Sequence, residues 1–454
     1  MARLFPALFV LALVAVTSTA RANPEPPYAY DARVAGMGGA ASASVDNAAA
    51  LFHNPGQLDQ IERFSVTAVI TSLLVNLRAP FAGPGTEQDS GIQYAPLMFL
   101  GGVGRVHERV TVGLGAYVYT GFGGGYRTVD CIGYGEDVPC DDPSYAGVIE
   151  PPQNQEVQLF VAELAVPIQV TVTKWLSLGV ALRMPWGRQR VTATQELPDT
   201  NPNTLDFGRA DQEISGFGIP GILFGASIRP VEGLNIALVY RSKVWVNMDG
   251  TTTADNPFDP AGDPFVIPTS TRWYVPHMLR FGIAYTTWQD RLTISGDFKA
   301  QFHREANESQ VFDLDNPVVP DTIAQFNWRN ALVGAIGLEV YATPRLPLRV
   351  GASLARSASN PDTMTPFTPP PGIQYGFYGG FGIDVDPIDI DLAAGWGGGQ
   401  PYSRSEVGDL CTDVDGPTRT MGRGPNRTIT ASGGCPGTYD VDSWFISFSA
   451  TYRM

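Results

Sequence analysis

The chain has 454 residues, a formal net charge of −15 and an isoelectric point near 4.7. A protein this acidic does not attract nucleic acid through a general positive field, so no nucleic-acid partner is expected. Only 17% of the residues are charged, and 50 glycines accompany a mean hydropathy of −0.03, a balance that is unusual for a soluble enzyme.

The first 22 residues are typical of a secretory signal peptide. Arg3 makes the start positive, the run LFPALFVLALVAV is apolar, and a small-residue stretch ends in Ala20-Arg21-Ala22. The apolar run is too short for a membrane anchor, and cleavage is expected before Asn23. Removing this segment takes away two arginines and no acid, so the formal net charge becomes −17.

Residues 63–454 consist of segments in which apolar and polar residues alternate, the pattern of a β-strand with one apolar face. In the last segment Trp444, Ile446 and Phe448 alternate with Ser447 and Ser449. In another, the predicted apolar face carries Ile236, Leu238, Tyr240, Val244, Val246 and Met248. Fourteen such segments are expected, near 64–76, 96–106, 109–120, 157–173, 176–196, 213–229, 234–249, 272–288, 291–306, 326–342, 347–356, 373–384, 388–397 and 443–454.

The connections between these segments alternate between long loops and tight turns such as "HE", "KW" and "QD". An even strand count with long loops at one end and short turns at the other is typical of a bacterial outer-membrane barrel. A bilayer admits only helices or closed barrels, because every backbone polar group must be paired internally. We therefore expect an all-β, transmembrane antiparallel barrel in the outer membrane of a Gram-negative bacterium. Six tryptophans near the predicted strand ends fit interfacial girdles: Trp175, Trp186, Trp245, Trp273, Trp288 and Trp444.

The four cysteines lie in two loop-like regions: Cys131 and Cys140 in one, Cys411 and Cys435 in the other. In an exported protein this arrangement suggests disulfides, and the local pairs are the simplest of three pairings. A metal site is the weaker interpretation, because neither CxxC nor clustered histidine accompanies the cysteines.

Signatures of catalysis are missing from the sequence. The four histidines, His53, His107, His277 and His303, form no ligand pair, and no GxSxG or activated Cys–His arrangement occurs. We expect no enzyme activity, no metal and no cofactor.

The stretch before the first strand is rich in Gly and Ala and contains Asp46-Asn47-Ala48 and then Asn54-Pro55-Gly56. It resembles the N-terminal hatch, or plug, of FadL/TodX-type (OMPP1) outer-membrane transporters of long-chain fatty acids and other hydrophobic compounds. The stretch GLGAYVYTGFGGGY (113–126) resembles the third strand of that family, and GFGIPGILFGASIRPVEGLNIALVYRSKV its central hairpin. Three positions depart from the pattern: Gly56 replaces Ala, His277 stands where Glu is common, and Met454 replaces a terminal Phe.

The resemblance covers residues 28–454 and implies a signal peptide (1–22), a hatch (23–62) and a barrel (63–454). It implies passive, hatch-gated diffusion of hydrophobic molecules with lateral exit at a kink formed by Gly121, Phe122 and Gly123. Replacing Gly121 and Gly123 with Val should then seal the exit while folding survives. The third outer loop, 197–212, is short, which argues against a surface collecting site.

The implied partners are hydrophobic small molecules, outer-membrane lipid and lipopolysaccharide, and the barrel-assembly machinery, with the protein as a monomer. A general porin and a structural or secretion-partner barrel remain as alternatives. The Gly-Ala plug argues against the porin.

Strand parity turns five basic side chains toward the lumen, where a cation can bind the carboxylate of a ligand in a partly dry site: Arg183, Arg241, Lys243, Arg280 and Lys299. Arg241 and Lys299 are the preferred candidates. For each of the five, pairing with an inward acid such as Asp297 is the alternative interpretation.

Overall fold

The structure is a computed structural model, and it describes residues 30–81, 84–129, 153–196, 207–254, 263–315, 321–408, 429–431 and 433–454. The predicted signal peptide lies outside these residues, as do Cys131, Cys140 and Cys411. Cys435 is buried just before the last strand, and the disulfide pairing stays a prediction.

One antiparallel sheet closes on itself, because the first strand, β1 (Phe64–Pro80), pairs with the last, β22 (Gly437–Arg453). The barrel has 14 strands, as predicted. Besides β1 and β22, eight strands of the barrel wall are continuous: β3 (Gln93–His107), β4 (Val110–Val129), β5 (Gln153–Thr173), β6 (Leu176–Glu196), β16 (Ala331–Thr343), β17 (Leu346–Arg356), β18 (Ile373–Val385) and β19 (Ile388–Gly399). Short strands lie beyond the main wall: β2 (Glu87–Asp89), β15 (Thr322–Gln325), β20 (Tyr402–Arg404) and β21 (Ile429–Ala431).

The remaining four strands of the wall are each broken once. They are β7 (Phe207–Phe217) with β8 (Gly221–Val231), β9 (Leu234–Arg241) with β10 (Val244–Ala254), β11 (Phe265–Val275) with β12 (Met278–Thr287), and β13 (Leu292–Gln301) with β14 (Ser309–Leu314). The breaks shift the alternation of side chains. Arg241 and Val244, three residues apart, are both almost fully buried.

Because of this shift, the prediction that residues 236–248 present one continuous apolar face is wrong. Leu238 is 48% exposed, on the outside, whereas Val244, Val246 and Met248 are completely buried. The predicted face therefore changes sides at Ser242-Lys243, and its second half lines the lumen. Trp273 is also buried, in a ring cluster with Phe326 and Trp328, rather than at an interfacial girdle.

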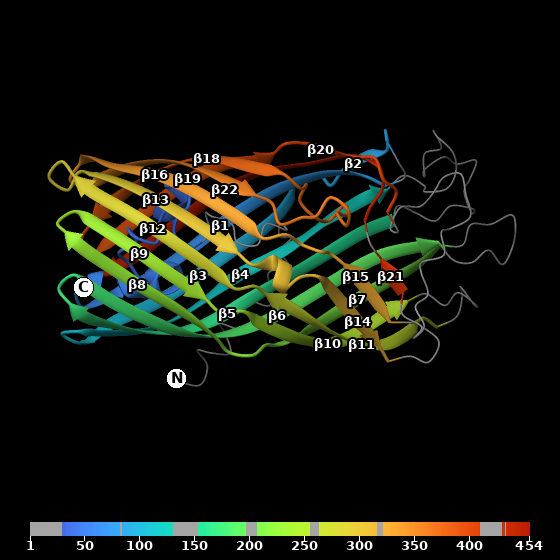
Figure 1. The fold of residues 1–454 in the computed structure, drawn as a ribbon, viewed down its shortest axis with the longest axis horizontal. Helices are drawn as coiled ribbons and strands as arrows, with labels where there is room; N and C mark the ends of the chain where they lie inside the picture. The colour runs from blue at the N-terminus through green and yellow to red at the C-terminus, as the bar shows by residue number, and fades with distance from the viewer. Residues whose placement is uncertain are drawn as a thin grey trace, which may run out of the picture.

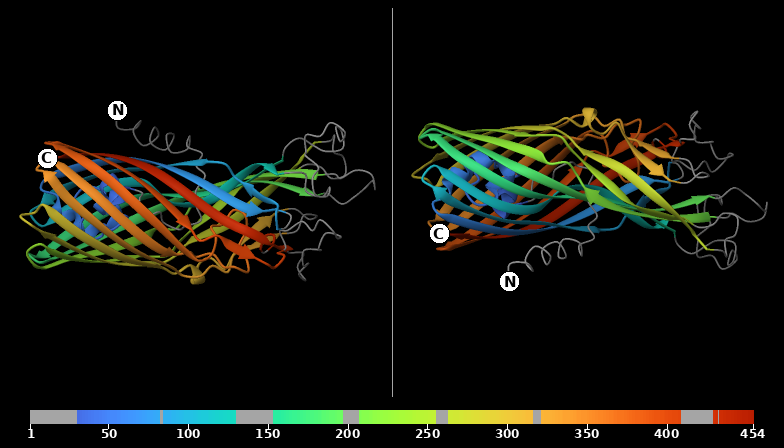
Figure 2. Two further views of the ribbon diagram at one scale, coloured as in Figure 1. Left: turned by 90° about the horizontal axis from the view of Figure 1, so that it is seen from above. Right: turned by 90° about the horizontal axis from the view of Figure 1, so that it is seen from below.

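The outer surface of the barrel is apolar. Alternate residues such as Ile336 (67% exposed), Phe377 (59%) and Val350 (57%) remain uncovered, while polar residues of the opposite parity are buried. An exterior of this kind is suited to lipid rather than water. The chain is a membrane-spanning barrel of the outer-membrane type, with the short turns and the C-terminus at one end (Figures 1 and 2). No helix among the described residues is long and apolar enough to cross a membrane.

Residues 30–61, here the plug segment, lie inside the barrel in the half nearer the short turns (Figures 1 and 2). They form α2 (Ala32–Gly36), α3 (Ala50–His53) and the 3-10 helix η1 (Pro55–Gln60). Asn54 caps η1 by accepting a hydrogen bond from the Gly56 N–H. The wall comes so close that a Cβ added at Gly225 would collide with Asn54 and Pro55. Glycine at this position therefore allows the plug backbone to pack against the strand.

Candidate transport pathway

The wall has a gap between β3 and β4. Their ladder runs from the pair His107–Val110 only as far as Phe99–Tyr117. Beyond that point β3 stays paired with β1 down to Gln93, and β4 stays paired with β5 up to Val129. No ladder pair among these described residues joins 93–98 to 118–129. A hydrogen bond from the Gln93 side chain to the Gly125 carbonyl, at 3.1 Å, crosses the gap.

β4 bulges where the gap begins. Val118 pairs with Ala162 of β5, and Thr120 pairs with Val161, the next residue of β5. Tyr119 between them therefore has no pair in the β4–β5 ladder. The hydroxyl of Tyr30, in the plug segment, donates to the Tyr119 carbonyl at 2.7 Å. The irregularity thus begins two residues before the predicted kink, since Gly121 and Phe122 still pair with β5.

Gly123 cannot be replaced as the sequence suggested. Its φ is +148°, and an added Cβ would collide with the Val157 carbonyl of β5. A Val at this position would strain the backbone as well as clash. The structure therefore argues against the expectation that folding survives a Gly123→Val substitution, and the opening is better tested at other residues.

A buried cluster of charges lies beside the gap. Glu163 of β5 accepts from Arg183 and from Arg241, each at 2.7 Å, and from the Tyr117 hydroxyl at 2.9 Å. All four side chains are almost fully buried. The guanidinium of Arg241 also lies 4.0 Å from the ring centroid of Tyr119 and 5.1 Å from that of Phe52 in the plug segment. Two cations therefore share one carboxylate at the junction of plug, bulge and wall.

Glu163 is not among the residues predicted from the sequence, although strand parity places it on the same side of β5 as the buried Val161 and Ala165. Its inward position could have been read from the alternation in VAELAV. Its two partners could not, because they come from β6 and β9 and meet it only through the register of the sheet.

Two more predicted cations line the lumen near the plug. Arg280 of β12 and Lys299 of β13 are cross-strand neighbours and are both buried. The Arg280 guanidinium lies 3.4 Å from Nδ1 of His53. Asp297, expected as a partner for such cations, accepts hydrogen bonds from the hydroxyl and N–H of Ser42 in the plug segment.

Lys243 is placed differently from its prediction. It lies in the break between β9 and β10, where its ammonium donates to the Glu305 carbonyl at 3.1 Å and lies 4.5 Å from the centroid of the Tyr274 ring. Tyr274 follows the buried Trp273 and so faces outward. The parity argument fails at Lys243 because the break shifts the alternation by one residue.

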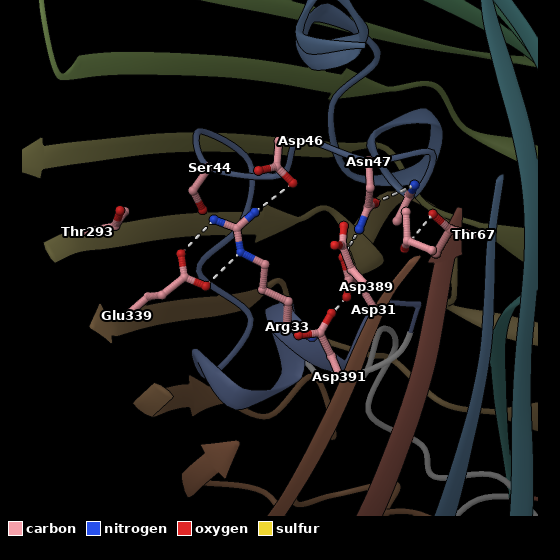
Figure 3. Close-up of polar contacts among 12 residues, drawn as sticks. Asp31, Arg33, Ser44, Asp46, Asn47, Thr67, Thr293, Glu339, Asp389 and Asp391 are labelled. Carbon is pink, nitrogen blue, oxygen red and sulfur yellow. Dashed lines mark hydrogen bonds and ion pairs between the residues drawn. The ribbon is translucent and has the colours of Figure 1, made fainter. Parts of the chain in front are cut away.

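Ion pairs hold the other side of the plug segment (Figure 3). Arg33 of α2 pairs with Asp46 and with Glu339 of β16, each at 2.7 Å. Glu339 also pairs with Arg349 of β17. Asp31 caps α2 and accepts from Asn47 at 2.8 Å, so the predicted Asp46-Asn47-Ala48 step contributes two of these contacts.

The pKa values of Asp31 and Asp46 are shifted in opposite directions. Burial, followed by the nearby charge of Asp391, raises the pKa of Asp31 from 3.8 to about 6. Burial acts in the same sense on Asp46, but its ion pairs with Arg33 and Arg453 outweigh it and lower the pKa of that carboxyl. Asp46 therefore stays ionised in the pH range in which Asp31 titrates.

No family model and no curated protein matches the chain. Solved structures match it closely in fold. A FadL homologue of Pseudomonas aeruginosa has a TM-score of 0.72 at 16% identity, over 96% of this chain and all of that one. The toluene transporter TbuX of Ralstonia pickettii has a TM-score of 0.66 at 16% identity, over 94% of this chain and 99% of its own. The toluene transporter TodX of Pseudomonas putida also reaches 0.66 at 16% identity, over 96% and 100%. The chain has the fold of these transporters, and the resemblance predicted from its motifs is confirmed at that level.

Proposed function

We propose that this barrel is a passive outer-membrane channel for hydrophobic compounds, which leave it sideways through the wall. The observation that carries the proposal is the stretch in which β3 and β4 are not paired, beside the plug segment and the Glu163 cluster. Unpaired backbone is costly in hydrocarbon, so a break at membrane depth should be retained only where protein or a passing molecule fills it.

The lining of the lumen supports this proposal over a general porin. The half toward the long loops carries Val246, Met248, Trp273 and Val275, all buried and apolar. A porin interior is polar and filled with water. An apolar lining instead gives hydrophobic molecules a path across the polar lipopolysaccharide layer, driven by their concentration gradient alone.

The plug segment is the proposed gate. It blocks the turn end of the lumen, and Tyr30 and Phe52 connect it to the bulge and to Arg241. A molecule that displaces Phe52 from Arg241 would disturb both the plug and the edge of the gap. Gating would then need no energy source, because the bound molecule itself shifts the equilibrium between two arrangements of the plug.

The Glu163 cluster is the proposed site for the polar end of a substrate. Two arginines meet one carboxylate in this buried site, and the carboxylate of a ligand would be attracted to the Arg241 guanidinium. This favours fatty acids or other hydrophobic acids, with Arg241 as the contact and Lys299 as the second candidate. The matching structures include both a FadL homologue and toluene transporters, so neutral compounds belong in the same test.

The test is transport by the purified full-length chain in proteoliposomes whose outer leaflet carries lipopolysaccharide, the layer that slows hydrophobic compounds. Toluene and oleate should equilibrate faster than in protein-free vesicles, whereas a sugar of similar size should not. Faster sugar entry would favour a porin. Unchanged rates for all three compounds would contradict transport and favour a structural or secretion-partner barrel.

A further inference from the structure

A second polar site lies in the aromatic part of the lumen, farther toward the long loops. Between β13 and β14 the chain makes a short 3-10 helix, η3 (His303–Glu305). The His303 ring is 2% exposed and meets Trp328 edge to face, with 5.4 Å between centroids. Trp328 in turn contacts Trp273 at 5.8 Å and Phe326 at 5.3 Å. We call these four residues the aromatic niche.

The hydrogen bonds around His303 determine where its proton lies. The Asn307 amide nitrogen donates to the Tyr274 carbonyl at 2.9 Å, which orients the amide. Its oxygen then faces Nδ1 of His303, at 2.9 Å. An amide oxygen only accepts, so Nδ1 carries the hydrogen and the neutral ring presents a bare lone pair at Nε2.

That Nε2 is buried and has no hydrogen-bond partner among the described residues. Protonating it would place an unbalanced charge in an aromatic environment, with the Lys299 ammonium on the same side of the preceding strand. Nε2 is therefore an unused acceptor. Native proteins rarely leave such groups unpaired, and the exceptions often have a functional reason.

A buried donor lies on the same face. Gln301 precedes His303 by two residues, is 1% exposed, and its Nε2 also has no partner among the described residues. Gln301 pairs across the ladder with Met278, which pairs in turn with Arg241 of the Glu163 cluster. Trp328 belongs to residues 326–330, outside any strand, so its side chain can move without breaking the ladder.

We propose that the aromatic niche binds the hydroxyl group of a phenolic compound on its way through the barrel. The phenol O–H donates to Nε2 of His303, the phenol oxygen accepts from the Gln301 amide, and the ring packs against Trp328 and Trp273. An aromatic hydrocarbon without the hydroxyl leaves both groups unpaired. The inference rests on the proposed transport function and specifies a substrate class for it.

The experiment compares 4-methylphenol with toluene, which differ by one hydroxyl. Binding to the full-length protein in detergent is followed by quenching of tryptophan fluorescence. In the His303→Phe variant, the affinity for 4-methylphenol should fall about tenfold, the loss expected for one buried hydrogen bond, while that for toluene stays unchanged. Gln301→Leu should weaken 4-methylphenol binding in the same selective way, without altering the ring. His107→Phe, at the exposed end of β3, is the matched control and should change neither.

The possible outcomes distinguish a failure of the proposed phenol site from a failure of the proposed transport function. Equal losses for both probes in a folded variant would show that His303 only packs, and would overturn the inference. Unchanged 4-methylphenol affinity in both His303→Phe and Gln301→Leu would overturn it as well. If the wild-type protein binds neither probe, nor oleate, the proposed transport of hydrophobic compounds itself fails.

Discussion

The hydroxyl of Tyr30 donates a 2.7 Å hydrogen bond to the backbone carbonyl of Tyr119, 89 residues away. The first residue belongs to the plug segment and the second is the bulge of β4. A carbonyl that leaves its ladder in the wall of a membrane barrel needs another donor, and the plug supplies one. This hydrogen bond couples plug and gap, and it can be removed without removing a ring.

Tyr30→Phe should loosen this coupling. The variant removes the hydrogen bond to the Tyr119 carbonyl, at a cost of about 0.5–1.5 kcal/mol to the closed arrangement. We expect more frequent opening events in planar bilayers and faster amide exchange around residues 117–121. The barrel itself should remain folded, as judged by its resistance to unfolding in detergent at room temperature. Identical opening statistics in the variant would contradict the coupling.

Gly225→Val should displace the plug segment. The added side chain would collide with Asn54 and Pro55, whereas the strand around it is otherwise regular. We expect higher conductance and new protease sensitivity within residues 30–61, with the barrel intact. Gly334→Val is the matched control, because a Cβ there meets nothing within 4 Å. If both variants conduct like the wild type, the plug does not gate the lumen.

A reversible cross-link tests lateral exit. A Cβ added at Gly125 would lie 3.6 Å from Oε1 of Gln93, the far end of that side chain, so cysteines at these two positions call for a short, reducible bis-methanethiosulfonate linker rather than a direct disulfide. Linking the Gln93→Cys/Gly125→Cys variant should slow toluene and oleate uptake, and a reductant should restore it. The single variants, carried through the same redox cycle, control for the native cysteines. Uptake that persists across a complete cross-link would rule out exit at this gap.

Arg241→Ala should separate acidic from neutral substrates. Losing this cation removes the proposed contact for the ligand carboxylate and should lower oleate affinity about tenfold or more, with little effect on toluene. Lys299→Ala should act in the same direction if it is the second contact. Lys243→Ala serves as the control, since that ammonium contacts the Glu305 carbonyl and the Tyr274 ring rather than the Glu163 cluster. Intact oleate affinity in both Arg241→Ala and Lys299→Ala would place the carboxylate elsewhere.

The docking of the plug should depend on pH through Asp31. Its pKa is raised from 3.8 to about 6 by burial and by the charge of Asp391, so the docked state holds a proton that the released state gives up. Docking is then strongest below the ordinary value and weakens as the pH rises through about 6. Amide exchange within residues 30–61 should be slower at about pH 4 than at about pH 8.

Asp31→Asn should remove most of that pH dependence, since an amide does not titrate. Asp46 should not replace it in this window, because its ion pairs lower its pKa and keep it charged throughout. An unchanged pH profile in Asp31→Asn would assign the dependence to another group.

Much of the fold could be predicted because its signals are local. Period-two alternation marks each strand, and a turn such as Lys174-Trp175 or a long connection shows in the spacing between segments. Fourteen segments with loops of alternating length specify a closed barrel before any contact is known, since a bilayer tolerates no free edge. The Gly-Ala stretch with Asn54-Pro55-Gly56 likewise predicted a segment that is not part of the wall.

Only the tertiary structure determined which charges meet. Glu163 joins Arg183 and Arg241 because the shear of the sheet brings β5, β6 and β9 into register inside one lumen, and register is a long-range property that no single segment encodes. Breaks in the strands decided the rest. One at Ser242-Lys243 moved Lys243 to the outside and Val244 to the inside, and another after Gln301 turned His303 and Asn307 toward each other. Alternation predicts a face only while the ladder is unbroken, and whether a ladder breaks depends on neighbours that the local sequence does not contain.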